Sequence, residues 1–208
     1  MSLKPILFNA EMVRALLEGR KTVTRRVVKP QPMLDGHLWK LGGAAWSDSV
    51  LSVPVMLGHS LYNRAPYQPG DVLWVRETWC EVMGRKGKYL YRAYAGERDD
   101  TRDYAIALNT WRPSIHMPRE AARIFLRVKN VRVERLQELT LKDAEMEGMD
   151  LRGPMFVDFV KVWNNTVQRH PNKFKRYPYC WEDNPWVWVI EFERVEKPAK
   201  NNLDGENP

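Results

Sequence analysis

The hydrophobic and polar positions at the start of the chain predict a strand that leads into a helix. Residues 4–8 form a short run that predicts a strand. The apolar residues that follow have helical spacing and lie on one stripe: Met12, Val13, Leu16 and Leu17. Asn9 stands at the N-cap position, and Gly19 suits the residue that follows a helix. We therefore expect one helix between these two residues.

Five later segments have the composition of strands, namely residues 20–28, 72–77, 89–95, 122–134 and 186–192. The first of them is β-branched and basic, and the second is a short apolar run after a Pro-Gly-Asp turn. In the long fourth segment the apolar positions change parity around Lys129 and Asn130, which indicates a bulge.

Two helices are expected late in the chain. Thr140-x-x-Asp143 resembles a capping box and predicts a short helix that ends at Gly148. A second helix is indicated by Pro154 near its first position. Its apolar residues follow helical spacing: Phe156, Phe159, Val160, Trp163 and Val167.

Prolines and glycines interrupt residues 29–69, which predicts a long insertion with little regular structure. A second insertion is expected near residues 97–121, and residues 197–208 have the composition of a disordered tail. Five or six short strands with one early and two late helices predict an α+β fold, a small mixed β-barrel with flanking helices. We expect this single domain to span residues 1–196.

The composition limits where and how the protein works. No apolar run approaches the roughly 20 residues of a membrane-spanning helix, and the N-terminus lacks the features of a signal peptide, so we expect a cytoplasmic protein. The 2 cysteines and 4 histidines are scattered without ligand spacing. We therefore expect no disulfide framework, no metal site and no cofactor.

The charge balance favours an anionic partner. Lys and Arg number 33 against 26 Asp and Glu, which gives a net charge of +7. Such a field attracts polyanions, and the 9 tryptophans supply rings that stack on bases. Many basic proteins bind no anion, however, and tryptophan is also good core material.

Four segments resemble, in order, the conserved blocks of the ASCH domain family: residues 19–25 (GRKTVTR), 70–73 (GDVL), 139–149 (LTLKDAEMEGM) and 188–192 (WVIEF). The resemblance spans most of residues 5–194. It implies the PUA-like fold and a ligand that is RNA or a modified base. Similar longer proteins occur in phages and prophages.

Within that family the chain resembles small bacterial amidohydrolases that remove the acetyl group from N4-acetylcytidine, and the resemblance implies that Lys21, Thr24 and Glu147 are catalytic. Amide hydrolysis needs a nucleophile, a base and an acid. We assign Thr24 as nucleophile, Lys21 as base, and Glu147 as the acid or as the group that orients Lys21. Residues three apart on a regular strand point to opposite faces, so Lys21 and Thr24 converge only if the chain still turns at Lys21.

The same residues have a structural alternative, in which Lys21 lies on a solvated basic strand and Glu147 is a solvent-facing carboxylate near a helix end. Further candidate ligand contacts are Arg25, Arg26, Arg76, Glu77, Trp79, Trp111 and Arg112. In one interpretation Glu77 accepts a hydrogen bond from a base amine, and Trp79 stacks on the ring of that base. In the other, Glu77 forms an ion pair at the end of a strand, and Trp79 is a core residue. Trp111 and Arg112 lie in a loop suited to contact phosphate.

Four functions remain open at this point. The first is an amidohydrolase that acts on an acylated pyrimidine nucleoside or on RNA that carries one. The second is a non-catalytic RNA-binding module of phage or prophage origin, and the third is a metal-independent ribonuclease. A structural phage component is the fourth and least specific alternative. The expected partner is RNA or a modified pyrimidine nucleoside, and the oligomeric state is left open.

Overall fold

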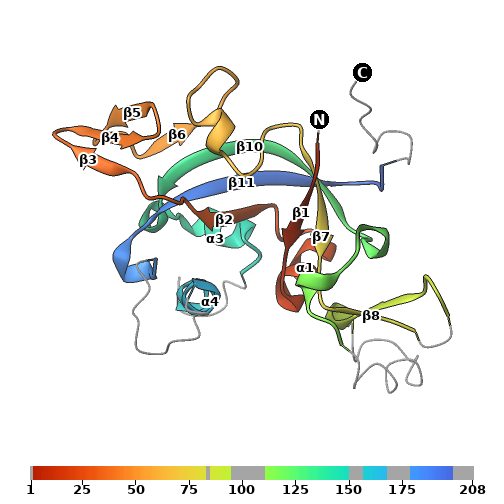
Figure 1. Ribbon diagram of the computed structural model, residues 1–208. Helices are drawn as coiled ribbons and strands as arrows, with labels where there is room; N and C mark the ends of the chain where they lie inside the picture. The colour runs from red at the N-terminus through yellow and green to blue at the C-terminus, as the bar shows by residue number, and fades with distance from the viewer. Residues whose placement is uncertain (1, 83–84, 95–110, 150–156, 168–178, 199–208) are drawn as a thin grey trace, which may run out of the picture. The chain divides into compact units, whose positions relative to one another are not determined.

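The computed structural model describes residues 2–82, 85–94, 111–149, 157–167 and 179–198 (Figure 1). Its strands are β1 (Leu3–Leu7), β2 (Val23–Val27), β3 (Met33–Asp35), β4 (Leu38–Leu41), β5 (Ala44–Ser47), β6 (Ser52–Pro54), β7 (Val72–Arg76), β8 (Trp79–Glu81), β9 (Tyr89–Tyr91), β10 (Phe125–Arg135) and β11 (Trp186–Val195). Its α-helices are α1 (Ala10–Leu17), α3 (Leu141–Met146) and α4 (Val157–Val167). Short 3-10 helices are η1 (Tyr62–Arg64), η2 (Arg92–Tyr94), η3 (Ser114–His116), η4 (Arg119–Ala121), η5 (Leu136–Glu138) and η6 (Trp181–Asp183).

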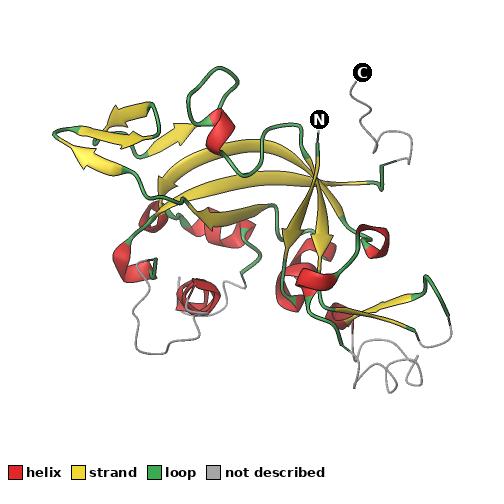
Figure 2. Cartoon of the chain, viewed as in Figure 1, coloured by secondary structure: helices red, strands yellow, loops and turns green. Residues whose placement is uncertain are grey.

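A mixed sheet dominates the fold (Figure 2). Hydrogen bonds join its strands in the order β1-β7-β10-β11-β2, with β6 also on β10. β1 and β7 are parallel, β10 pairs antiparallel with β7 and β6, and β11 pairs antiparallel with β2. The expected α+β class is therefore confirmed. These pairings do not by themselves close the sheet into a barrel, so closure stays a prediction.

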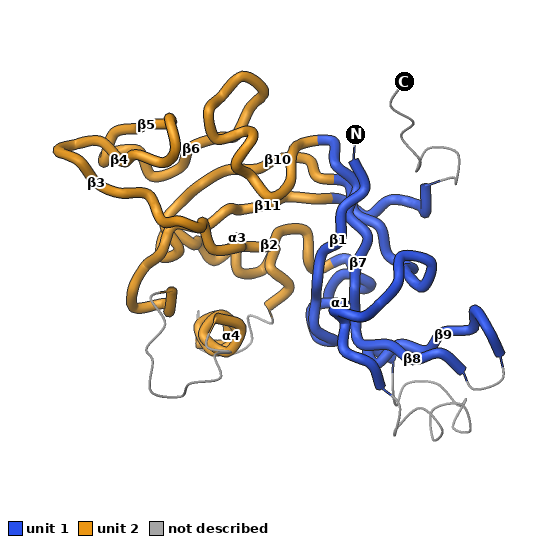
Figure 3. Tube along the Cα trace, viewed as in Figure 1, with its two compact units in different colours: residues 1–19, 70–127, 193–208 blue, residues 20–69, 128–192 orange. Residues whose placement is uncertain are grey.

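The chain divides into two compact units (Figure 3). Unit 1 consists of Met1–Gly19, Gly70–Arg127 and Glu193–Pro208, and unit 2 consists of Arg20–Pro69 and Val128–Phe192. The expectation of a single domain over residues 1–196 stays a prediction.

Unit 1 contains α1, which begins and ends where the sequence indicates. The Asn9 side chain accepts the Met12 N–H at 2.8 Å, and Gly19 has a φ of +77°, which glycine adopts without strain. Arg14 Nε donates to Ala93 O at 2.9 Å and so ties α1 to η2. A buried cluster stabilises the rest of the unit: Val72, Trp79, Met117, Ala121, Ala122 and Phe125.

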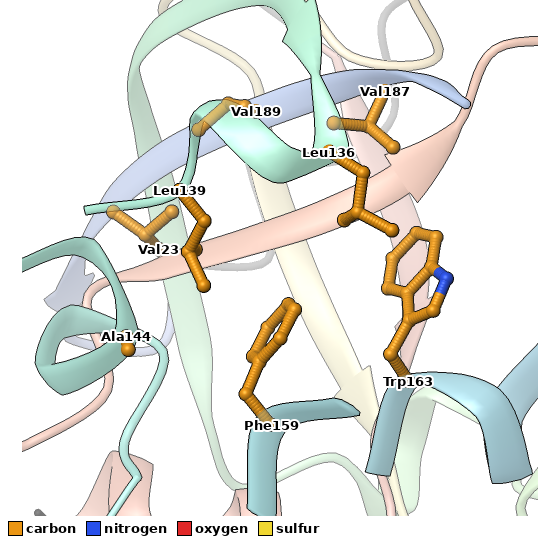
Figure 4. Close-up of a cluster of buried hydrophobic side chains, with 8 residues drawn as sticks. All are labelled: Val23, Leu136, Leu139, Ala144, Phe159, Trp163, Val187 and Val189. Carbon is orange, nitrogen blue, oxygen red and sulfur yellow. The ribbon is translucent and has the colours of Figure 1, made fainter. Parts of the chain in front are cut away.

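Unit 2 has a core to which two strands and three helices contribute (Figure 4). Its buried members are Val23, Leu136, Leu139, Ala144, Phe159, Trp163, Val187 and Val189. Phe159 and Trp163 of α4 stack with their ring centroids 6.2 Å apart, and Trp163 Nε1 donates to Tyr179 O at 2.8 Å. The predicted capping box is present, because the Thr140 and Asp143 side chains each bond the other's backbone N–H. The core therefore holds α3 against β2.

Residues 29–69 contain four short strands, so the prediction of little regular structure there is wrong. β3, β4 and β5 form an antiparallel meander, and β6 pairs with β10. Gly36 and Gly42 have positive φ and make the turns of the meander. Runs of three or four residues carry too little periodicity to be recognised, and β6 is fixed by a partner far along the chain.

Several boundaries differ from expectation by a few residues. The strand expected over 89–95 ends at Tyr91, and β10 begins at Phe125 rather than at 122. The parity change in β10 is confirmed, since Val128 and Val131 are buried while the two residues between them are exposed.

Some expectations fall outside the described residues, namely those for 97–110, Pro154, Phe156 and the tail from 199. Within the part of the chain that is described, no helix is long and apolar enough to cross a membrane.

The core of unit 2 generates a stability prediction. Leu136 is 0% exposed, whereas Leu57 is 84% exposed. We expect Leu136→Ala to lower the free energy of unfolding by about 2–5 kcal/mol, because it removes buried methyl groups and leaves a cavity. Leu57→Ala is the matched control and should change it by less than about 0.5 kcal/mol. Urea unfolding followed by circular dichroism measures both, and equal effects would contradict this core.

Candidate functional site

The C-terminal end of α3 meets the chain just before β2. Lys21 and Glu147 form an isolated β-bridge, and Thr22 N donates to Met146 O at 2.8 Å. Phe192 N donates to Thr22 O at 2.9 Å from the other side. Lys21 thus precedes the regular part of β2, and its backbone is fixed by residues more than a hundred positions away.

The Lys21 amine is fully buried and bonds to three oxygens. Nζ donates to Glu147 Oε2 at 2.6 Å, to Glu147 O at 3.0 Å and to Val23 O at 2.8 Å. The Lys21 side chain is 0% exposed and that of Glu147 is 5% exposed. An ammonium group has three N–H donors, so these oxygens match the charged form of the amine.

Arg25 lies beside this pair and joins it to further carboxylates. Nη1 donates to Glu147 Oε1 at 3.3 Å, and Nη2 donates to Glu134 Oε1 at 2.7 Å. Nη2 also lies 3.4 Å from Asp143 Oδ1. Arg25 Nε is buried and has no hydrogen-bond partner among the described residues. One guanidinium group therefore connects β2 to both β10 and the first turn of α3.

A second arginine extends the network towards the surface. Arg132 Nε donates to Glu134 Oε2 at 2.9 Å, and Nη2 donates to Asp143 Oδ1 at 3.2 Å. Arg132 Nη1 also bonds Glu191 Oε1 on β11. We call the set Lys21, Arg25, Arg132, Glu134, Asp143, Glu147 and Glu191 the charge network.

Burial lowers the pKa of Lys21 below its ordinary value, because desolvation penalises the ammonium form. The Glu147 carboxylate raises this pKa and so opposes the shift, while the charges of Arg26 and Arg25 add to it. A lysine whose pKa is lowered in this way is a candidate proton carrier.

Thr24 is buried, and its hydroxyl accepts a hydrogen bond from Arg26. Arg26 Nη1 donates to Thr24 Oγ1 at 3.0 Å and to Arg25 O at 3.0 Å. Alternation along β2 puts Thr24 and Arg26 on one face of the strand and Val23 and Arg25 on the other. Of the proposed catalytic residues, Lys21 and Glu147 are in direct contact, whereas the Thr24 hydroxyl accepts from Arg26.

The other predicted contacts lie in unit 1. Glu77 is 1% exposed, and Arg123 binds both of its carboxylate oxygens, Oε1 at 2.8 Å and Oε2 at 2.9 Å. The Arg123 guanidinium lies 4.0 Å from the Tyr91 ring centroid and 4.6 Å from that of Tyr94. Burial raises the pKa of Glu77, and Arg123 opposes that shift. This geometry fits the alternative of an ion pair at the end of a strand.

Trp79 is 3% exposed and belongs to the unit 1 core. Arg112 lies over its ring at 5.3 Å, and the two residues exchange backbone hydrogen bonds. Arg76 lies over the Trp74 ring at 5.3 Å and also bonds Ile115 O. Trp111 is half-buried and Arg112 is exposed. Their roles in ligand binding stay predictions.

Sequence reasoning missed the residues that complete both clusters. Glu134 and Arg132 stand in a strand whose apolar positions were the only recognised signal, and Asp143 was recognised only as a capping residue. Arg123 carries no local signal either. The role of each of these residues depends on a partner that is distant in the sequence. Arg25, for example, binds Glu134 from 109 positions away.

Within the described ranges, no group of three or more His, Cys, Asp or Glu side chains is arranged to hold a metal ion. Comparisons with protein-family models, with curated proteins and with solved structures give no match to this chain.

The burial of Glu147 predicts a large effect of its neutralisation. Glu147→Gln removes the anion that Lys21 and Arg25 share, and leaving a buried charge without its partner costs about 3–5 kcal/mol of unfolding free energy. Glu145→Gln, at an exposed position of the same helix, should change it by less than about 0.5 kcal/mol. Chemical denaturation at pH 7 measures both variants, and similar values would mean that the network adds nothing to stability.

The lowered pKa of Lys21 predicts how stability depends on pH. Between that pKa and the unfolded value near 10.5, the unfolded chain binds the proton that the folded chain has lost. The contribution of Lys21 to the free energy of unfolding therefore increases with pH through this window. We expect the difference in unfolding free energy, wild type minus Lys21→Met, to rise as pH approaches 10.5. A flat or falling difference would show that the pKa of Lys21 is not lowered.

Proposed function

We propose that this protein is an ASCH-type protein with a PUA-like barrel, and that it hydrolyses the acyl amide of an N4-acylated cytosine, in a nucleoside or in RNA. Four sequence blocks in the order of that family, together with a mixed sheet and few helices among the described residues, support the proposal. The basic charge of +7 favours a substrate that carries phosphate.

One observation carries the proposal: Lys21 Nζ and Glu147 Oε2 are 2.6 Å apart and buried. Removing a lysine and a glutamate from water costs several kcal/mol per ion, and apolar residues of similar volume would stabilise the fold as well or better. A buried pair with a lowered lysine pKa therefore favours a role in proton transfer.

The proposed reaction uses the pair as a proton relay. The Lys21 ammonium passes a proton to Glu147 Oε2, and burial assists this step because desolvation penalises the ammonium form. The neutral amine leaves the Val23 carbonyl and takes the proton of the Thr24 hydroxyl. Catalytic hydrogen bonds of this kind often form only once substrate is bound.

The bond changes then follow in two steps. Thr24 Oγ1 adds to the acyl carbon, the bond from that carbon to N4 breaks, and Glu147 gives its proton to N4, which leaves as the cytosine amine. Water then attacks the acyl-threonine ester, Thr24 regains its proton through Lys21, and the carboxylic acid is released. Acid–base assistance of this kind contributes about 10²–10⁴-fold to a rate.

A second candidate function is a non-catalytic module that binds RNA. The observation in its favour is that the Lys21 side chain is 0% exposed and its amine bonds three protein oxygens. In that function the charge network fixes the strand, and the cationic surface holds the phosphate backbone. The two functions differ in whether Lys21 is needed for chemistry or only for the fold.

The test is conversion of N4-acetylcytidine, free and within a short RNA, to cytidine, followed by liquid chromatography. We expect turnover by the wild type and a loss of about 10²-fold or more in both Lys21→Ala and Thr24→Val. Lys142→Ala, an exposed lysine of α3, is the control and should retain full activity.

No turnover by a folded wild-type sample on either substrate would overturn the hydrolase. RNA binding whose affinity falls steeply with salt would then favour the non-catalytic module. Turnover that survives in folded Lys21→Ala would remove Lys21 from the mechanism.

A further inference from the structure

The large apolar side chains that are exposed to solvent concentrate in one segment of the chain. Of the 11 such side chains in the described residues, 7 lie within residues 33–57: Met33, Leu34, Leu38, Val50, Leu51, Met56 and Leu57. This segment begins with the meander of β3, β4 and β5 in unit 2. Apolar surface is unfavourable in water, so its concentration in one segment indicates a surface that binds a partner.

One face of the meander carries an apolar stripe that continues to a free edge (Figure 1). Trp46, Trp39 and Leu34 are direct cross-strand partners on β5, β4 and β3, so they share this face. Trp39 and Trp46 each contact the Trp186 ring, with centroids 5.3 Å apart, and this contact covers one end of the stripe. Leu34 is 51% exposed, and β3 pairs with β4 alone among the described strands. The stripe is therefore covered at β5 and open at β3.

The charges of this segment favour a second copy of the chain over a polyanion. Residues 33–57 contain one lysine and two aspartates, in a chain whose net charge is +7. Lys40 Nζ donates to Asp35 Oδ2 at 2.5 Å, and Asp48 Oδ2 lies 3.1 Å from Nδ1 of His37. Two copies that meet through this segment bring nearly neutral surfaces together, whereas a phosphate backbone finds no excess of cations there.

We propose that two copies of this chain pair through β3, antiparallel about a twofold axis at Leu34, so that the two meanders form one continuous sheet. Leu34 then packs on Leu34 of the second copy beside Trp39, and Met33 lies opposite Asp35 of the second copy. An axis at Asp35 would place two carboxylates face to face, which is destabilising. An axis at Met33 would place Pro32, which has no N–H to donate, opposite Leu34. The edge is thus self-complementary in one register, and this inference is independent of the proposed hydrolysis.

Cysteine crosslinking tests the register. Residues on the axis face each other with Cα atoms about 4.5–5.5 Å apart, within reach of a disulfide, whereas diagonal residues are about 7–8 Å apart and beyond it. We expect Leu34→Cys to form a crosslinked dimer on mild oxidation at least about tenfold faster than Met33→Cys, as measured by non-reducing electrophoresis. Met33 is the more exposed residue, at 74% against 51%, so random collision would favour Met33→Cys instead. The native Cys80 and Cys180 are both buried.

Sedimentation equilibrium measures the association itself. The mass of the wild type should rise with concentration from 24.5 kDa towards twice that value. Leu34→Lys places two ammonium groups face to face at the axis and should raise the Kd of the dimer at least about tenfold, because like charges across an interface repel. Ile115→Lys, at a residue of unit 1 that is 58% exposed, is the control and should associate as the wild type does. Circular dichroism shows whether each variant is folded.

Three results would overturn the proposal. A wild-type mass of 24.5 kDa at every concentration would assign the apolar face to a partner other than a second copy. A dimer that folded Leu34→Lys does not weaken would mean that the copies meet elsewhere. Equal crosslinking rates for Leu34→Cys and Met33→Cys would mean that β3 does not pair about Leu34.

Discussion

The buried contact between Lys21 and Glu147 is the constraint on which the rest of unit 2 depends. Each charge would cost several kcal/mol to bury alone, so neighbouring residues must supply partners. Arg25 compensates the second oxygen of Glu147, and Glu134 and Asp143 in turn compensate Arg25. The requirement to satisfy one ion pair thus fixes β2, β10 and α3 together, and the apolar cluster around Val23 and Ala144 fills the space beside them.

Two adjacent arginines perform opposite tasks because a strand directs successive side chains to opposite faces. Arg25 points to the carboxylates and is neutralised by them, which makes it part of the framework. Arg26 points to the Thr24 face, where it meets a hydroxyl and a carbonyl. The same residue type therefore bonds carboxylates at one position and a hydroxyl and a carbonyl at the next.

In unit 1, the buried carboxylate of Glu77 is compensated in a different way. Arg123 binds both carboxylate oxygens of Glu77, and the rings of Tyr91 and Tyr94 flank Arg123. The bidentate pair satisfies Glu77 with one side chain, whereas Glu147 is shared between a lysine and an arginine. Burial lowers the pKa of that lysine, and Glu147 opposes the shift.

The sequence by itself determined the features that depend on near neighbours. Four features arise from residues that are close neighbours in the sequence. They are the Asn9 cap, the apolar stripe of α1, the capping box at Thr140 and the strand at residues 186–192. Lys21 and Glu147 were singled out by a family resemblance, not by local pattern. Only the tertiary structure decided that they touch, that Thr24 bonds Arg26, and that Glu134 and Arg132 complete the network. The physical reason is that a buried charge is tolerated only with partners, and those partners lie up to 126 positions apart in the chain.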